Sequence, residues 1–327
     1  MLLRIVNFVA DSEHAPTGHR VGMLHQGRVA DFAVVAAACA SVQAECEAPS
    51  SWSSALSVAT CEACLAAAQQ YADWFEAQPD SVRENLSLAR DQVRLLPPVL
   101  NPGKVFCLAQ NFPSHVAESD QHITQSGQSV ADAMTPHVFM KPSSTVCGDG
   151  DPIWVSRNTQ FLDYEAEAAV IIGRRCKYVS PEEAVGCIAG VSACNDVSER
   201  KLKVWERQEE REWDRFFDWL NGKWMDNSLP LGPALVPAAS VNLDDLNLRC
   251  LVNGELRQTG NTGEMFHNAA RTVSYISQIL TLEPGDVIAL GTPGGVGAGS
   301  GRKLMPGDVV TVEIEGLMAL TNPVVTE

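Results

Sequence analysis

No stretch of this sequence stays apolar for the ~20 residues that a membrane-spanning helix needs. Residues 1–10 hold only a short apolar segment with one arginine, and no small-residue cleavage site of the secretory type follows it. We therefore expect a cytoplasmic protein without a membrane partner.

Basic residues are scarce relative to acidic ones. The chain has 24 Lys and Arg against 40 Asp and Glu, so its formal net charge is −16. A field of this sign repels phosphate backbones, and we expect no nucleic-acid partner. A small anion is still compatible with this charge, because a local cation can reverse the field inside a cleft.

The sequence also lacks the two common glycine-rich signatures of nucleotide sites. The glycine-rich segment Leu290–Gly297 contains neither the G-K-[ST] of a P-loop nor the G-x-G-x-x-G pattern, and we expect no helix after it. Its backbone N–H groups and the hydroxyl of Thr292 could contact an anion, although a tight turn explains the glycines equally well.

What the sequence does contain is typical of a globular protein. Of its 327 residues, 45% are apolar and 20% are charged. The ten cysteines lie mostly among small apolar residues, as buried thiols do. Cys61 and Cys64 form a C-x-x-C pair, but a structural zinc site usually needs a second pair. We therefore favour packing over a metal or redox role for them.

Prolines divide the chain near residue 100. Residues 95–103 contain three of them, which break regular structure. Before this point, short strands within 1–35 are followed by a helical region over 36–95. After it, β-strand patterns dominate. The sequence thus predicts a small N-terminal α+β domain, 1–100, and a larger β-rich domain, 101–327.

Two long elements are predicted in the second part. The apolar run over 161–172 predicts one continuous strand. Residues 199–221 predict a charged amphipathic helix whose apolar face carries Trp213, Phe216, Phe217 and Leu220. We favour packing of this aromatic face on the core over direct contact with a substrate.

Two glutamates of the predicted strand are the first candidates for chemistry. Side chains alternate along a strand, so Glu165 and Glu167 project to the same side, with Cβ atoms about 7 Å apart. Asp196 follows another apolar run, Ile188–Ala193. Close carboxylates repel each other unless a cation lies between them. These acids suggest a site for Mg²⁺, or else Mn²⁺ or Ca²⁺, and a solvated strand face is the alternative.

A histidine and two further charged residues complete the candidates. His115 and Glu118 share one face of a short helix opened by Pro113, and a carboxylate raises the basicity of a neighbouring imidazole. Such a pair could take a proton from water, but on spacing alone a surface pair is favoured. Lys223, next to apolar bulk, could provide a fixed positive charge in a pocket, and a surface lysine is again the alternative.

Taken in order, these segments resemble the fumarylacetoacetate hydrolase family over about Lys104 to Gly301. The motifs that carry the resemblance are Asn111–Glu118, Phe139–Pro142, Asp163–Gly173, Asn195–Arg200, Lys223, Pro230–Pro233, Val252–Glu255 and Pro284–Gly297. Each is modest alone, and their order makes the match specific.

The resemblance implies a mixed, β-rich α+β fold in which a β-roll catalytic domain follows a small N-terminal domain. It implies a divalent metal, held by Glu165, Glu167 and Asp196 and completed by water and substrate. The additional aspartate ligand of the animal-type enzymes has no counterpart here, where Gln110 and Asn111 stand. It further implies a homodimer.

The resemblance also assigns roles to the remaining candidates. His115 and Glu118 would sit on a mobile lid and activate water, and Lys223 would stabilise negative charge. The residues expected to contact the bound 2-oxo acid are Lys223, Thr292, Arg200 and Gln258. The segment 199–222 is longer and more aromatic than the usual linker of small members.

The function expected from this combination is metal-dependent hydrolysis of a C–C bond in a 2,4-dioxo acid of the acylpyruvate type. The leaving carbanion would depart as an enolate bound to the metal. The alternatives within the family are decarboxylation of oxaloacetate-like acids and isomerisation or hydration of 2-oxo acids in aromatic catabolism. A non-catalytic Ca²⁺-binding protein is the alternative from another class, and the His115–Glu118 pair argues against it.

Overall fold

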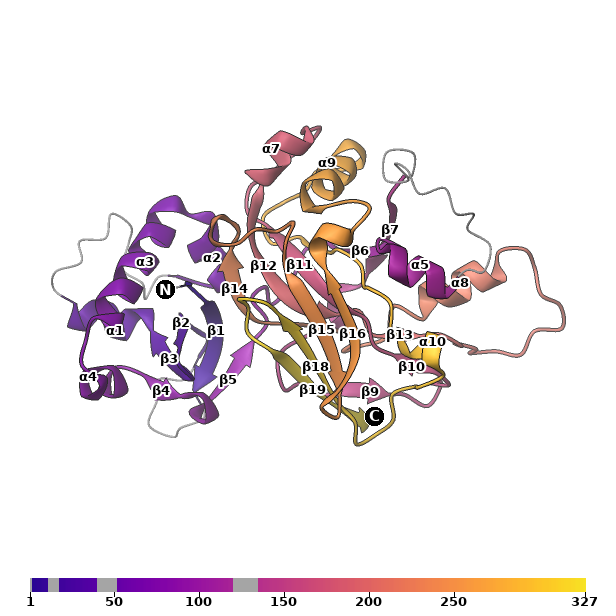
Figure 1. The fold of residues 1–327 in the computed structure, drawn as a ribbon, viewed down its shortest axis with the longest axis horizontal. Helices are drawn as coiled ribbons and strands as arrows, with labels where there is room; N and C mark the ends of the chain where they lie inside the picture. The colour runs from indigo at the N-terminus through magenta and orange to yellow at the C-terminus, as the bar shows by residue number, and fades with distance from the viewer. Residues whose placement is uncertain (1, 11–17, 40–51, 120–134) are drawn as a thin grey trace.

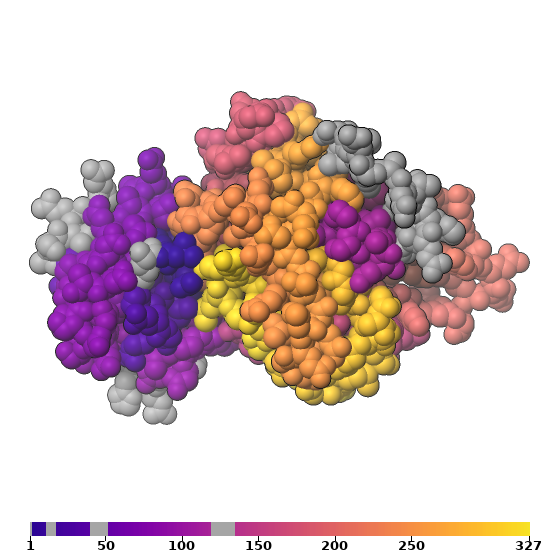
Figure 2. All heavy atoms as spheres, in the orientation of Figure 1, coloured from indigo at the N-terminus to yellow at the C-terminus, as the bar shows by residue number. Residues whose placement is uncertain are grey.

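The computed structural model describes the chain except for residue 1 and residues 11–17, 40–51 and 120–134. Figure 1 shows a smaller N-terminal part, in indigo and purple, beside a larger strand-rich part, and the same two parts are visible with all heavy atoms drawn in Figure 2. Among the described residues, no helix combines the length and apolar character of a membrane span. Part of the predicted helical region 36–95 lies outside the described residues.

The N-terminal part combines short strands with helices. Its elements are β1 (Ile5–Ala10), β2 (Arg20–His25), β3 (Arg28–Asp31), α1 (Phe32–Ala38), α2 (Ala55–Thr60), α3 (Glu62–Glu76), α4 (Asp80–Asn85), β4 (Leu88–Ala89), η2 (Arg90–Gln92) and β5 (Val93–Leu96). Side chains of Asp31 and Ser54 cap α1 and α2 by accepting backbone N–H bonds. Phe75 of α3 is buried in one core with Met23 of β2. This part has the α+β composition predicted for it.

One sheet runs through both parts. Its order is β4-β3-β2-β1-β14-β12-β11-β17-β6-β7, with β5 beside β1 and β8 beside β14. The strands of the larger part in this sheet are β6 (Val105–Ala109), β7 (His137–Lys141), β8 (Val146–Cys147), β11 (Ala166–Ile172), β12 (Ile188–Asn195), β14 (Leu229–Pro237) and β17 (Val287–Ala289). Ile5 of β1 pairs with Leu235 of β14. The sheet therefore includes strands from both sides of residue 100. The division into two domains at this point stays a prediction.

A second sheet covers one face of the first. Its order is β16-β15-β18-β19-β9, and its strands are β9 (Ile153–Val155), β15 (Asn247–Val252), β16 (Glu255–Asn261), β18 (Val309–Ile314) and β19 (Leu320–Thr326). A separate pair is formed by β10 (Leu162–Asp163) and β13 (Ser198–Glu199). Val170 of β11 and Leu248 of β15 are buried in the same core cluster. The architecture confirms the predicted strand-rich mixed fold.

Short helices connect these strands. They are α5 (Pro113–Ser119), η3 (Ser143–Thr145), α7 (Pro181–Val185), α8 (Asp214–Asn221), η4 (Ala238–Ser240), η5 (Thr262–Glu264), α9 (Ala269–Ile279) and α10 (Gly297–Ser300). In Figure 1, α5 and α8 lie at the end of the larger part that is remote from the N-terminal strands. The four-residue α10 is a correction, since we expected no helix after the glycine-rich segment.

Two predictions for long elements are wrong. The strand expected over 161–172 is divided into β10 and β11, because the backbone at Glu165 bonds instead to Asn195 and Asp196. The helix expected over 199–221 exists only as α8. The carboxylate of Glu199 accepts bonds from backbone N–H groups, including that of Lys201, and this competes with a helix at its start.

The aromatic face of α8 is also not buried in the core, contrary to our preference. Trp213, Phe216 and Phe217 are 62%, 46% and 50% exposed. The packing of this helix is supplied instead by Leu220 and Trp219, which lie against a core cluster that includes Phe139.

Candidate active site

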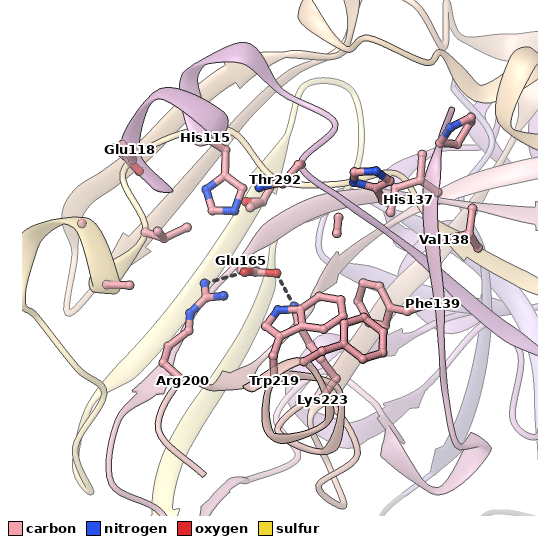
Figure 3. Close-up of a pocket in the computed structure, with 18 of the residues that line it drawn as sticks. His115, Glu118, His137, Val138, Phe139, Glu165, Arg200, Trp219, Lys223 and Thr292 are labelled. Carbon is pink, nitrogen blue, oxygen red and sulfur yellow. Dashed lines mark hydrogen bonds and ion pairs between the residues drawn. The ribbon is translucent and has the colours of Figure 1, made fainter. Parts of the chain in front are cut away.

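A cavity of about 1040 Å³ lies in the larger part of the molecule. Its polar lining residues include His115, Glu118, Glu165, Arg200, Lys223 and Thr292, and its aromatic ones include Phe139, Phe216 and Trp219. In Figure 3, the imidazole of His115 points toward Glu165 and Arg200. The cavity thus joins residues that are far apart in the sequence.

Three carboxylates meet beside this cavity. Glu167 lies on β11, Glu165 directly precedes it, and Asp196 directly follows the paired strand β12. Ala166 is in register with Asn195, and the N–H of Asp196 donates to the carbonyl of Glu165 at 2.9 Å. One ligand oxygen from each acid lies within 4.8 Å of the others, and all three side chains are buried. The antiparallel register therefore brings the acids together.

Two buried lysines are bonded to these carboxylates. Lys223 Nζ lies 2.7 Å from Glu165 Oε2 and 2.7 Å from Asp196 Oδ2. Lys141 Nζ lies 2.7 Å from Asp196 Oδ1 and also donates to the carbonyls of Val197 and Ser228. Lys223 is therefore a buried ammonium at the cavity, and the surface alternative for it is wrong. Lys141 is a residue to which sequence reasoning gave no role.

Arg200 connects the acids to the glycine-rich loop. Its guanidinium donates to Asp163 and Glu165. Asp163 also accepts from the N–H groups of Gly297 and Ala298 at the start of α10. Asp163 thus fixes Arg200 at the cavity wall and holds the loop beside it, a role that the sequence did not reveal.

The charges set the ionisation of the cluster. Burial alone would raise the pKa of Glu165, but Arg200 and Lys223 hold it below its ordinary value. Burial raises the pKa of Glu167 well above its ordinary value, and the nearby Asp196 adds to this. Burial alone would lower the pKa of Lys223, yet Asp196 and Glu165 raise it. Glu165 is therefore anionic and Lys223 cationic at neutral pH.

The donor set fits a hard divalent cation. Its ligands are carboxylate oxygens, which Mg²⁺, Mn²⁺ and Ca²⁺ prefer. Glu167 Oε2 is oriented by the N–H of Gly291 at 2.7 Å. Burial first, and then the nearby carboxylates of Asp196 and Glu165, raise the pKa of this acid, and a cation would relieve the repulsion among the three. Glu165, Glu167 and Asp196 are the residues that would hold such an ion.

His115 and Glu118 both lie on α5 and line the cavity. Burial lowers the pKa of His115, so its imidazole is neutral at neutral pH. Glu118 Oε1 accepts from the N–H of Gly295 at 2.7 Å and so ties α5 to the glycine-rich loop. The two residues share the helix face that the spacing predicted. Their roles in water activation stay a prediction.

Thr292 and Gln258 form a bonded pair behind the wall. Gln258 Nε2 donates to Thr292 Oγ1 at 2.7 Å and to the carbonyl of Pro293 at 2.8 Å, and its Oε1 accepts from the N–H of Ala166. Thr292 lines the cavity, whereas Gln258 does not. This geometry therefore does not place Gln258 in contact with a substrate in the cavity. Its amide is used in the interior, where it positions Thr292.

A family model described as fumarylacetoacetate (FAA) hydrolase C-terminal matches residues 104–325. The chain belongs to the fumarylacetoacetate hydrolase family. This confirms the resemblance that the ordered motifs indicated. The match begins directly before β6 and includes every residue of the site described above.

Individual members of the fumarylacetoacetate hydrolase family are also similar. The oxaloacetate tautomerase fahd2 of Xenopus laevis, named as mitochondrial, is 37% identical over 243 residues, which are 73% of this chain and 70% of that protein. Protein Rv2993c of Mycobacterium tuberculosis is 39% identical over 234 residues, 71% of this chain and 79% of that protein. A solved structure of a fumarylacetoacetate hydrolase from Exiguobacterium antarcticum has a TM-score of 0.71 at 30% identity and covers 99% of this chain and 100% of its own.

Proposed function

We propose that this member of the fumarylacetoacetate hydrolase family is a metal-dependent hydrolase that cleaves a C–C bond in a 2,4-dioxo acid of the acylpyruvate type. The observation that carries the proposal is a neutral, half-buried imidazole on the cavity wall that faces the acidic cluster and its cations. Hydrolysis needs a base that takes a proton from water and a positive charge that binds the anionic dioxo acid, and the residues of this cavity include both.

The substrate is an anion, and the cations on the cavity wall would bind it. Arg200 and Lys223 both line the cavity. Their positive charge favours a carboxylate and an adjacent 2-oxo oxygen. When bound by Glu165, Glu167 and Asp196, a divalent cation supplies Lewis-acid polarisation of oxygen atoms.

The proton transfers fall to His115. Its imidazole takes a proton from water as the hydroxide oxygen bonds to the C4 carbonyl carbon. The C3–C4 bond then breaks, and its electron pair passes to C3 to give an enolate stabilised by the positive charge of Lys223. Return of the proton from the imidazolium to C3 gives pyruvate and a carboxylic acid. Glu118, bonded to Gly295, holds α5 in position against the loop during these steps.

A tautomerase is the second candidate, and the similarity to proteins named oxaloacetate tautomerases favours it. The same imidazole could move a proton between C3 of a 2-oxo acid and its enol oxygen without consuming water. Decarboxylation of an oxaloacetate-like acid requires the same enolate. The candidates therefore differ in the bond that breaks, and product analysis separates them.

The test is an assay of the purified chain with acetylpyruvate, benzoylpyruvate and enol-oxaloacetate, each with Mg²⁺, with Mn²⁺ and with a chelator. We expect metal-dependent release of pyruvate from an acylpyruvate, and a large loss of kcat in His115→Ala. His19→Ala, which changes an exposed histidine far from the cavity lining, is the matched control. Tautomerisation of oxaloacetate without cleavage of any acylpyruvate would overturn the hydrolase and favour the second candidate.

A further inference from the structure

The aromatic side of the cavity has no part in the chemistry described so far. Phe216 and Trp219 of α8 and Phe139 of β7 line the same space as the charged residues. Large apolar side chains are normally removed from water, yet Phe216 is 46% exposed at this wall. An apolar group bound in the cavity would remove these rings from water.

The rings extend directly from the charged centre. Lys223 Nζ lies 5.1 Å from the ring centroid of Phe139, whose ring meets that of Trp219 edge-on at 5.1 Å. The ring of Phe216 follows at 5.8 Å from that of Trp219. In Figure 3, Trp219 and Phe139 lie side by side next to Lys223 and Glu165. A ligand anchored by its acid end at Lys223 thus reaches an aromatic surface within a few bonds.

The helix that carries Phe216 and Trp219 is fixed next to the charged centre. The N–H of Gly222 donates to the carbonyl of Asp218, and its own carbonyl accepts from the N–H of Glu199 at 2.9 Å. A Cβ at Gly222 would lie 2.2 Å from the carbonyl oxygen of Glu199, so only glycine permits this close approach. Lys223 follows immediately. The spacing between the ammonium and the rings is therefore set by the backbone.

We propose that Phe216 and Trp219 form a specificity subsite for an aromatic group on the acyl end of the substrate. This inference rests on the proposed function and narrows its substrate class to aroyl- or arylacylpyruvates. A phenyl ring bound there would meet the rings of Trp219 and Phe216 in the offset or edge-on arrangements that aromatic pairs prefer. A short-chain dioxo acid would leave these rings in water.

The subsite can be tested by equilibrium binding, which does not depend on the bond that breaks. Phenylpyruvate and pyruvate are titrated calorimetrically into the full chain with Mg²⁺. We expect phenylpyruvate to bind more tightly by about tenfold or more, as one buried aromatic contact predicts. Phe216→Ala should remove most of this preference and leave pyruvate affinity unchanged. Trp219→Leu, which keeps an apolar side chain against Phe139, should reduce the preference as well.

Phe217→Ala is the matched control, because Phe217 is a neighbouring exposed ring on α8 that does not line the cavity. It should keep the full preference. Equal affinity for the two acids in the wild type would overturn the subsite. The subsite would also be overturned if the Phe216 and Phe217 variants lost the preference for phenylpyruvate equally and both sedimented as a smaller species. That result would assign the aromatic face of α8 to contact with a second copy of the chain. A retained preference without cleavage of benzoylpyruvate would overturn the hydrolase and support the subsite.

Discussion

The ammonium group of Lys223 lies 2.7 Å from a carboxylate oxygen of Glu165, and both side chains are buried. The same ammonium lies 2.7 Å from Asp196. A buried ion pair is expensive to break, since the partner left behind keeps its desolvation cost. Lys223 therefore holds together two of the carboxylates that would bind a cation, and the stability of the metal-free protein depends on it.

Replacing Lys223 by Met should destabilise the metal-free protein by about 3 kcal/mol or more. Mg²⁺ should restore more stability to this variant than it adds to the wild type, because the cation then meets carboxylates without an ammonium partner. Chemical unfolding with a chelator and with Mg²⁺ measures both effects. Lys203→Met, which removes an exposed lysine paired with Glu206, should change stability by less than about 0.5 kcal/mol in either condition.

Replacing Glu167 by Gln tests the metal site by removing one of its expected ligands. Burial raises the pKa of Glu167, so with a chelator the folded protein holds a proton that the unfolded chain releases. The stability of the wild type should then fall as pH rises above the ordinary pKa of a glutamate. The variant should lose this slope, because its amide does not titrate and still accepts from Gly291. It should also lose the stabilisation by Mg²⁺. A variant that Mg²⁺ stabilises as much as the wild type would remove Glu167 from the ligand set.

The pH dependence of turnover should report His115. Burial lowers its pKa below the ordinary value of 6.5, so the neutral, proton-accepting form persists down to mildly acidic pH. A cation at the neighbouring carboxylates lowers it further. We expect kcat/KM to rise with pH below 6.5 and to level off by neutral pH. A limb that rises only above neutral pH would contradict the role of this imidazole as the base.

Local patterns account for one hairpin turn and for the acids. Asn253 and Gly254, at φ 54° and 78°, make the hairpin turn between β15 and β16 that their sequence favours. Glu165, Glu167 and Asp196 were identified because acids next to apolar runs are unusual. Their convergence depends on the pairing of β11 with β12, which follows from the burial of both strands.

Long-range partners could not be predicted in the same way. A lysine beside proline at the end of a strand, such as Lys141, has no sequence signal for the distant Asp196 that it contacts. The amphipathic pattern of α8 identified an apolar face but not what covers it, and here the face borders a cavity at Phe216. The strand over 161–172 is interrupted because Asn195, 30 residues away, bonds the backbone of Glu165.

Replacing Gln258 tests whether this residue positions Thr292 or contacts the substrate itself. Its amide bonds the N–H of Ala166, the hydroxyl of Thr292 and the carbonyl of Pro293, all in the interior. Gln258→Leu should cost about 2–4 kcal/mol of stability, since it leaves buried polar groups without partners. Turnover should fall through kcat, because the Thr292 hydroxyl loses one of its two bonds and keeps only the one to the carbonyl of Ala166, while the affinity for pyruvate stays near that of the wild type. Gln69→Leu, which removes one solvent-exposed bond to Asp73, should alter neither quantity measurably. A Gln258 variant that keeps full stability and loses only pyruvate affinity would instead place this amide in direct contact with the substrate.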